Sequence, residues 1–138
     1  MVKTLESRAE LESSVDSCEY LFHITNTEGL RKILETGTVK PLTFTGWDTV
    51  ASFTENPIEL SSGSSFIDGK NIVICFHRGR LEERGVRKVD YDLDYTKGDQ
   101  YSKDKWWVEC QDFSPESEWR CNVEVDVSGI IEWIYYMN

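Results

Sequence analysis

Residues 20–37 have the sequence YLFHITNTEGLRKILETG, and this stretch indicates how the fold is built. Its first part, Tyr20 to Ile24, is rich in aromatic and β-branched residues, which are typical of β-strands. Thr25 or Asn26 follows at the position where a polar side chain caps the first turn of a helix. The sequence therefore predicts a strand that leads directly into a helix.

The helix is expected from about Thr27 to Glu35. Its apolar residues Leu30, Ile33 and Leu34 are spaced so that they share one face. Gly37 lies just beyond the helix and can adopt the left-handed conformation that ends many helices. This strand, cap, helix and glycine form the clearest local unit in the sequence.

The remaining elements point to one α+β domain over residues 1–138, with helices early and a sheet that dominates the second half. The apolar stretch Asn71–His77 fits the middle of a sheet, and Val86–Tyr91 is expected to pair with it as a hairpin with a helical turn inserted. Loops are expected at Ser61–Ser65 and Asp92–Lys105. We expect a weak surface helix over Leu5–Val15 and further strands over Val39–Leu42, Thr49–Thr54, Trp119–Val127 and Ile130–Met137.

The charge and hydropathy of the chain limit its partners. Fifteen Lys and Arg against 25 Asp and Glu give a net charge of -10, which disfavours nucleic-acid binding, except where a nucleic acid is itself the target of a modification. The same acidity would let the chain imitate a nucleic acid towards a basic partner protein. No stretch approaches the roughly 20 apolar residues of a membrane span, and Met1 to Glu19 has no signal-peptide core, so we expect a cytoplasmic protein without membrane contact.

The cysteines do not suggest a metal site. Cys18, Cys75, Cys110 and Cys121 form no Cys-x-x-Cys pair, and in the cytoplasm they should stay reduced as small core residues. Cys75 and His77 share one strand face, but a closed zinc site usually needs two close pairs of ligands. We therefore expect no bound metal.

Three segments place pairs of polar residues on strands that otherwise look buried. Residues two apart in a strand face the same side, so each pair shares a face. If the three strands meet, they offer an imidazole, hydroxyls, a carboxylate and a guanidinium to a ribose-rich ligand, whereas each pair alone could equally be structural. The pairs are His23 with Thr25, Ser52 with Thr54, and Glu118 with Arg120.

The order of these motifs resembles small ADP-ribosyltransferase-like proteins. The nearest relatives that we can suggest are the AbiGi-like abortive-phage-resistance group and, more distantly, the DarT toxins, which implies a role in phage-host conflict. The resemblance spans the chain from about Tyr20 to its end. It is carried by Leu21-Phe22-His23-Ile24-Thr25, by Gly29 to Gly37, by Ser52-Phe53-Thr54 and by Glu116-Ser117-Glu118-Trp119-Arg120.

The resemblance implies a split antiparallel sheet with one or two N-terminal helices and with NAD, as substrate, held between its halves. Glu118 would act on the nicotinamide ribose, where a fixed carboxylate can stabilise developing positive charge. Glu116 would orient or deprotonate the acceptor, which is expected to be a protein or another macromolecule. The residues implied to bind NAD are His23, which would contact a ribose, and Thr25, Ser52, Phe53, Thr54 and Arg120.

Two hypotheses remain open. A transferase requires a cleft in which His23, Ser52 and Glu118 converge. A non-enzymatic acidic inhibitor instead requires carboxylates along one exposed face, for which Glu6–Asp16, Asp90–Asp94 and Glu109–Glu118 are candidates. Aromatic candidates for stacking on a ligand are Phe44, Trp47, Phe53 and Tyr91, and one of Trp106 and Trp107 is expected at the surface or at an interface.

Overall fold

The computed structural model describes residues 2–43, 49–58, 69–88, 118–121 and 123–137. In this part of the chain, no helix is long and apolar enough to cross a membrane. The helices are α1 (Arg8–Asp16), α2 (Thr27–Thr36) and α4 (Arg78–Glu83). The strands are β1 (Lys3–Thr4), β2 (Tyr20–Thr25), β3 (Thr38–Val39), β4 (Leu42–Thr43), β5 (Thr49–Thr54), β6 (Ile72–His77), β7 (Arg87–Lys88), β8 (Glu118–Cys121), β9 (Val125–Asp126) and β10 (Ile131–Tyr136).

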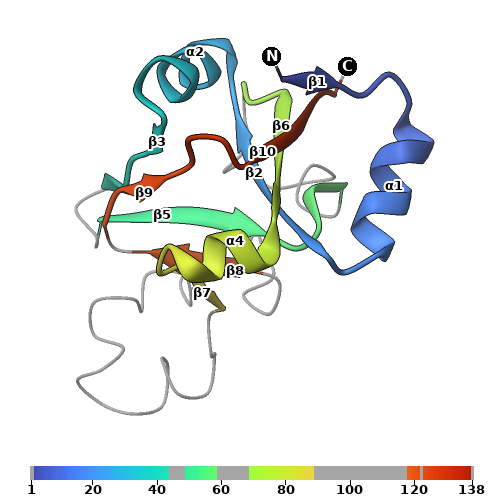
Figure 1. Ribbon diagram of the computed structural model, residues 1–138. Helices are drawn as coiled ribbons and strands as arrows, with labels where there is room; N and C mark the ends of the chain where they lie inside the picture. Colours follow the sequence, from blue (N-terminus) through green and yellow to red (C-terminus); the bar gives the residue numbers. More distant parts are fainter. Residues whose placement is uncertain (1, 44–48, 59–68, 89–117, 122, 138) are drawn as a thin grey trace.

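The protein is an α+β protein whose main sheet has seven strands in the order β1-β10-β6-β2-β5-β8-β7 (Figure 1). Strand β4 pairs with β5 beside this path, and β3 and β9 form a second, small sheet. The main sheet is mixed, because β1 runs parallel to β10 whereas its other described pairs are antiparallel. The expectation of an antiparallel sheet is therefore wrong at this edge, where two exposed residues without apolar alternation form β1.

Alternate residues of the central strand β6 divide the hydrophobic core into two layers. Ile72, Ile74 and Phe76 belong to the layer that also holds the buried residues of α2 and α4. Val73 and Cys75 belong to the layer that holds the buried Leu11 of α1, and α1 lies well apart from α2 and α4 in Figure 1. Both faces of the sheet are thus covered, which explains why β6 reads as a continuous apolar run.

The local unit of strand, cap and helix is confirmed. The Asn26 side chain accepts a hydrogen bond of 2.8 Å from the backbone amide of Gly29, and Thr36 is the last helical residue. Gly37 has a φ of 71°, and its amide donates to the carbonyl of Ile33. Gly29 also permits close packing, because a Cβ atom there would lie 1.9 Å from Thr25 Oγ1.

Two strand pairings differ from the sequence-based expectations. The turn of helix α4 after β6 is confirmed, but β7 pairs with β8 instead of with β6. The reason is that β2 and β10 already occupy both sides of β6. The single strand expected over Trp119–Val127 is divided into β8, which pairs with β5, and β9, which pairs with β3 in the small sheet.

Candidate functional site

The three polar strand segments lie on adjacent strands, because β5 is bonded to β2 on one side and to β8 on the other. Between β5 and β8, Thr54 is opposite Glu118 and Ser52 is opposite Arg120. Between β2 and β5, the backbone register pairs Phe22 with Thr54. The expected meeting of the three strands is therefore present in the sheet.

His23 bridges β2 and β5 through its side chain. Its Nδ1 lies 2.9 Å from the carbonyl oxygen of Ser52. Since a carbonyl only accepts, the proton is assigned to Nδ1, which leaves the lone pair on Nε2. Burial lowers the pKa of His23 to about 4, which outweighs the raising effect of the Ser52 bond, and Lys70 lowers the pKa further. The imidazole is thus neutral at pH 7 and can accept a hydrogen bond through Nε2.

Ser52 also contacts the carboxylate of Glu118. Its Oγ lies 3.4 Å from Glu118 Oε2, which in turn lies 3.6 Å from Arg120 Nε. Glu118 and Arg120 are buried, with 6% and 3% of their surfaces exposed. A buried carboxylate beside a buried guanidinium is a costly arrangement unless the two charges compensate each other. These residues therefore form a fixed charge pair with a hydroxyl group at its edge.

The register places His23 and Glu118 on opposite faces of the sheet. Phe22 shares a face with Thr54 and Glu118, so its neighbour His23 faces the other way. The ring of His23 accordingly lies 5.6 Å from that of Phe53. The side chains of His23 and Glu118 are linked through the backbone carbonyl and the hydroxyl of Ser52. The prediction that they converge on one face is therefore wrong.

Three other predicted binding residues have structural partners. Thr25 is buried and packs against Gly29 at the start of α2. Phe53 is a core residue that also contacts the ring of Phe76 at 5.7 Å. Thr54 is buried, and its Oγ1 accepts a hydrogen bond from the amide of Asn56 in the turn that follows β5. The contacts of these residues explain their positions without a ligand.

Several residues singled out in the sequence lie outside the described part of the chain. Among them is Glu116, the second predicted catalytic residue. The others are Phe44, Trp47, Ser61–Ser65, Tyr91, Asp92–Lys105, Trp106, Trp107 and Cys110, together with the acidic runs Asp90–Asp94 and Glu109–Ser117.

A polar network around Glu55 was not foreseen from the sequence. Glu55 Oε2 accepts a 2.6 Å hydrogen bond from the indole Nε1 of Trp119 and lies 3.1 Å from Lys88 Nζ. Glu55 Oε1 lies 3.9 Å from a terminal nitrogen of Arg78, whose guanidinium covers the Trp119 ring at 5.2 Å. Glu55 directly precedes Asn56-Pro57, a pair typical of a turn, and its sequence neighbours do not indicate a binding residue. The sequence signal that could have identified Glu55 is its position directly after the polar strand segment Ser52-Phe53-Thr54.

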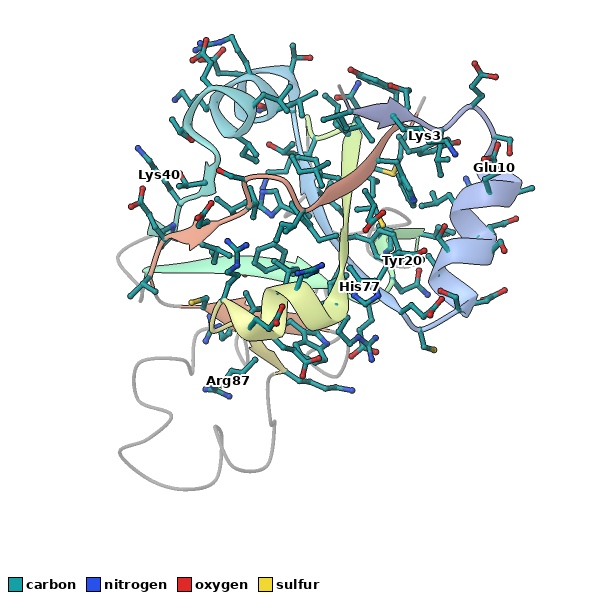
Figure 2. The ribbon with its side chains drawn as sticks, viewed as in Figure 1. Lys3, Glu10, Tyr20, Lys40, His77 and Arg87 are labelled. Carbon is teal, nitrogen blue, oxygen red and sulfur yellow. The ribbon has the colours of Figure 1, made fainter. Side chains whose placement is uncertain are left out.

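Cys18, Cys75 and Cys121 are free in the described structure, and Cys75 and Cys121 are buried as predicted. The prediction of a core residue is wrong for Cys18, which is exposed just after α1. Cys75 is fully buried, and this burial raises the pKa of its thiol strongly. His77 is exposed and meets the ring of Tyr20 edge-on at 6.0 Å, as the neighbouring labels in Figure 2 indicate. Within the described residues, no group of three or more potential metal ligands occurs.

Comparisons of the chain with protein-family models, curated proteins and solved structures found no match. The chemistry available at the candidate site therefore follows from its own contacts. It comprises a neutral imidazole whose Nε2 can accept a hydrogen bond, a hydroxyl group, and a buried carboxylate balanced by a guanidinium.

Proposed function

We propose that the chain is an ADP-ribosyltransferase-like protein that binds NAD and transfers ADP-ribose to a macromolecular acceptor. The observation that supports this proposal is the position of Ser52, which contacts His23 through its carbonyl and Glu118 through its hydroxyl. Ser52 of β5 thereby connects the His23 imidazole with the Glu118 carboxylate. The imidazole can accept a hydrogen bond from ribose, and the carboxylate can stabilise a developing cation.

Glu118 would stabilise the positive charge that develops on the ribose during transfer. The bond between the ribose C1′ and the nicotinamide nitrogen breaks, nicotinamide leaves with the electron pair, and the acceptor atom bonds to C1′ as it loses its proton. Positive charge develops on the ribose during this step, and a fixed carboxylate stabilises it. Ser52 and Arg120 both contact Oε2 of the buried Glu118 carboxylate, which restrains it before the reaction.

His23 is suited to bind a ribose hydroxyl. Its Nδ1 proton is engaged by the Ser52 carbonyl, so the ring orientation is fixed and Nε2 accepts. Since burial lowers its pKa to about 4, the ring accepts over the whole neutral range. A charged imidazolium would instead have no lone pair for the hydroxyl.

The opposite directions of His23 and Glu118 limit where the ligand enters. Strands β2 and β5 are paired at Phe22 and Thr54, and the side chain of His23, the next residue of β2, contacts the Ser52 carbonyl of β5. A ligand that reaches both groups must therefore lie beside this short pairing of β2 with β5.

The test uses labelled NAD with a bacterial lysate and four proteins: wild type, Glu118→Gln, His23→Ala and Glu124→Gln. Glu124 is an exposed glutamate near β9 and serves as the matched control. We expect Glu118→Gln to lose transfer by about 100-fold or more while NAD binding, measured by calorimetry, persists. His23→Ala should weaken NAD binding by about tenfold, and the control should match wild type.

Two results would count against the transferase. One is the absence of NAD binding by folded wild-type protein, and the other is label transfer that survives in Glu118→Gln. Circular dichroism spectra of each variant show whether the fold is retained, so that loss of activity through unfolding is recognised.

As a second candidate function, we propose that the chain is an acidic inhibitor of a basic protein. The acidic surface around α1 supports this proposal. The segment around α1 exposes five acidic side chains. Arg8, which pairs with Glu12 at 3.7 Å, is the basic residue of this helix. Binding to immobilised basic proteins that is lost when Glu10 and Asp16 are changed to Gln and Asn would favour this role, provided that NAD does not bind. The five residues are Glu6, Glu10, Glu12, Asp16 and Glu19.

A further inference from the structure

A short basic segment stands out on this acidic chain. Between Arg78 and Lys88 the sequence holds five Arg and Lys residues and two Glu residues, although the whole chain has a net charge of -10. The segment forms α4 and the edge strand β7. Arg87 of this segment lies below helix α4 in the view of Figure 2. The positive charge of this segment is therefore carried by α4, the turn after it and the edge strand β7.

Two cations of this segment share a single carboxylate. Lys88 Nζ lies 3.1 Å and the nearest Arg78 nitrogen 3.9 Å from the oxygens of Glu55. Glu55 also accepts the indole proton of Trp119, so one carboxylate contacts the indole and both cations. The local charge of Glu55, Arg78 and Lys88 together is positive.

Arg78 retains unused binding capacity. Its contact with Glu55 at 3.9 Å is too long for a hydrogen bond. Its Nε is buried and has no hydrogen-bond partner among the described residues. The central carbon of the guanidinium lies 5.2 Å from the centre of the Trp119 ring, a cation–π contact that restrains the side chain. About a quarter of the Arg78 side chain, 26%, and half of the Lys88 side chain, 51%, remain exposed, so an anion from solvent can reach both groups.

We propose that Arg78 and Lys88 form a binding site for the phosphate group of a compact ligand, with Glu55 holding the two cations when no ligand is bound. A planar guanidinium beside an ammonium group is well matched to phosphate oxygens. The ligand is small because attraction acts within a Debye length of about 8 Å, beyond which a polyanion would meet the net negative charge of the chain.

This site is separate from the residues proposed for transfer. Lys88 is opposite Trp119 in the sheet, so both face away from Glu118, the neighbour of Trp119 on β8. The proposed phosphate site therefore stands or fails independently of ADP-ribose transfer, and each can be tested without the other.

The experiment titrates the full chain with inorganic pyrophosphate and follows the arginine Nε–Hε signals by NMR. The Arg78 signal is assigned by its loss in Arg78→Lys. We expect this signal to shift and saturate, and Arg78→Gln or Lys88→Gln to weaken pyrophosphate binding by about tenfold, as monitored by calorimetry. Glu55→Gln should strengthen binding several-fold, because it removes the competing carboxylate.

Arg31→Gln is the matched control, since Arg31 is an exposed arginine on α2 that is already paired with Glu28 and Glu35. It should bind pyrophosphate like wild type. Titration with ADP distinguishes the source of the phosphate: tighter binding than pyrophosphate indicates a nucleotide, and equal binding indicates the phosphate group alone. An Arg78 signal that does not move at millimolar pyrophosphate, or Glu55→Gln binding weaker than wild type, would overturn the proposal. Pyrophosphate binding in a protein that fails to transfer ADP-ribose would leave it intact.

Discussion

The two faces of strand β8 carry charged groups in different ways. On one face, Glu118 and Arg120 form a buried pair, and on the other, Trp119 lies under Arg78 and beside Glu55 and Lys88, which are partly open to solvent. Water can replace a lost partner on the second face but not on the first. Burial, and not the number of charges, should therefore decide how much each interaction contributes to stability.

The largest effect is expected where the buried pair is broken. Arg120→Met leaves the buried Glu118 carboxylate without its 3.6 Å partner, which should lower the free energy of unfolding by about 3–5 kcal/mol. Urea denaturation followed by tryptophan fluorescence measures this change. The double variant Arg120→Met with Glu118→Gln should recover part of the loss, because no uncompensated charge remains. Equal stabilities of Arg120→Met and wild type would show that burial is not decisive here.

His23 lies on the same face of the sheet as Trp119, and its protonation should make the stability of the protein depend on pH. Its pKa is about 4 in the folded protein and near its ordinary value of 6.5 in the unfolded chain. Between these values the unfolded chain binds the proton more readily, so the contribution of His23 is complete above pH 6.5 and is lost as the pH falls towards 4. The loss should reach up to about 3 kcal/mol.

The measurement compares urea denaturation of wild type and His23→Gln at several pH values between 4 and 8. Glutamine can still donate an amide hydrogen to the Ser52 carbonyl but does not titrate. The difference in stability between the two proteins should therefore vary with pH across this range. A constant difference would mean that His23 is not desolvated by the fold.

The sequence identifies local units well, because their causes are local. Asn26 and Gly37 occupy the expected cap positions, and the apolar run of β6 forms an inner strand of the sheet. Strand partners were less predictable, since they depend on which edges are already occupied. The residues after α4 pair with β8 for this reason, as both sides of β6 are taken.

The site shows the same limit. Alternation within one strand correctly placed Glu118 and Arg120 on the same face. It does not predict which side chains of the neighbouring strand lie on that face. That depends on the register between strands, and a shift of one residue reverses every side chain. The register of Phe22 with Thr54 is what turns His23 away from Glu118. Sequence spacing could not have revealed it.

An intermediate effect is expected for the hydrogen bond between Trp119 and Glu55. Trp119→Phe keeps most of the ring beneath Arg78 but removes the donor of the 2.6 Å bond to Glu55. The free energy of unfolding should fall by about 1–2 kcal/mol, because the half-buried carboxylate recovers only part of the lost bond from water. Urea denaturation measures this change, and a loss as large as that of Arg120→Met would remove the contrast between the two faces.

The smallest effect is expected for Lys88, whose side chain is 51% exposed and lies 3.1 Å from Glu55. Lys88→Gln should change the free energy of unfolding by less than about 0.5 kcal/mol, since exposed ion pairs gain little over hydration and are screened by salt. The same denaturation series at low and high salt measures it, with Arg8→Gln as a control for an exposed pair on α1. If Lys88→Gln costs clearly more than Arg8→Gln, the Glu55 network is more strongly coupled than its exposure indicates, because its ion pairs support one another through the shared carboxylate.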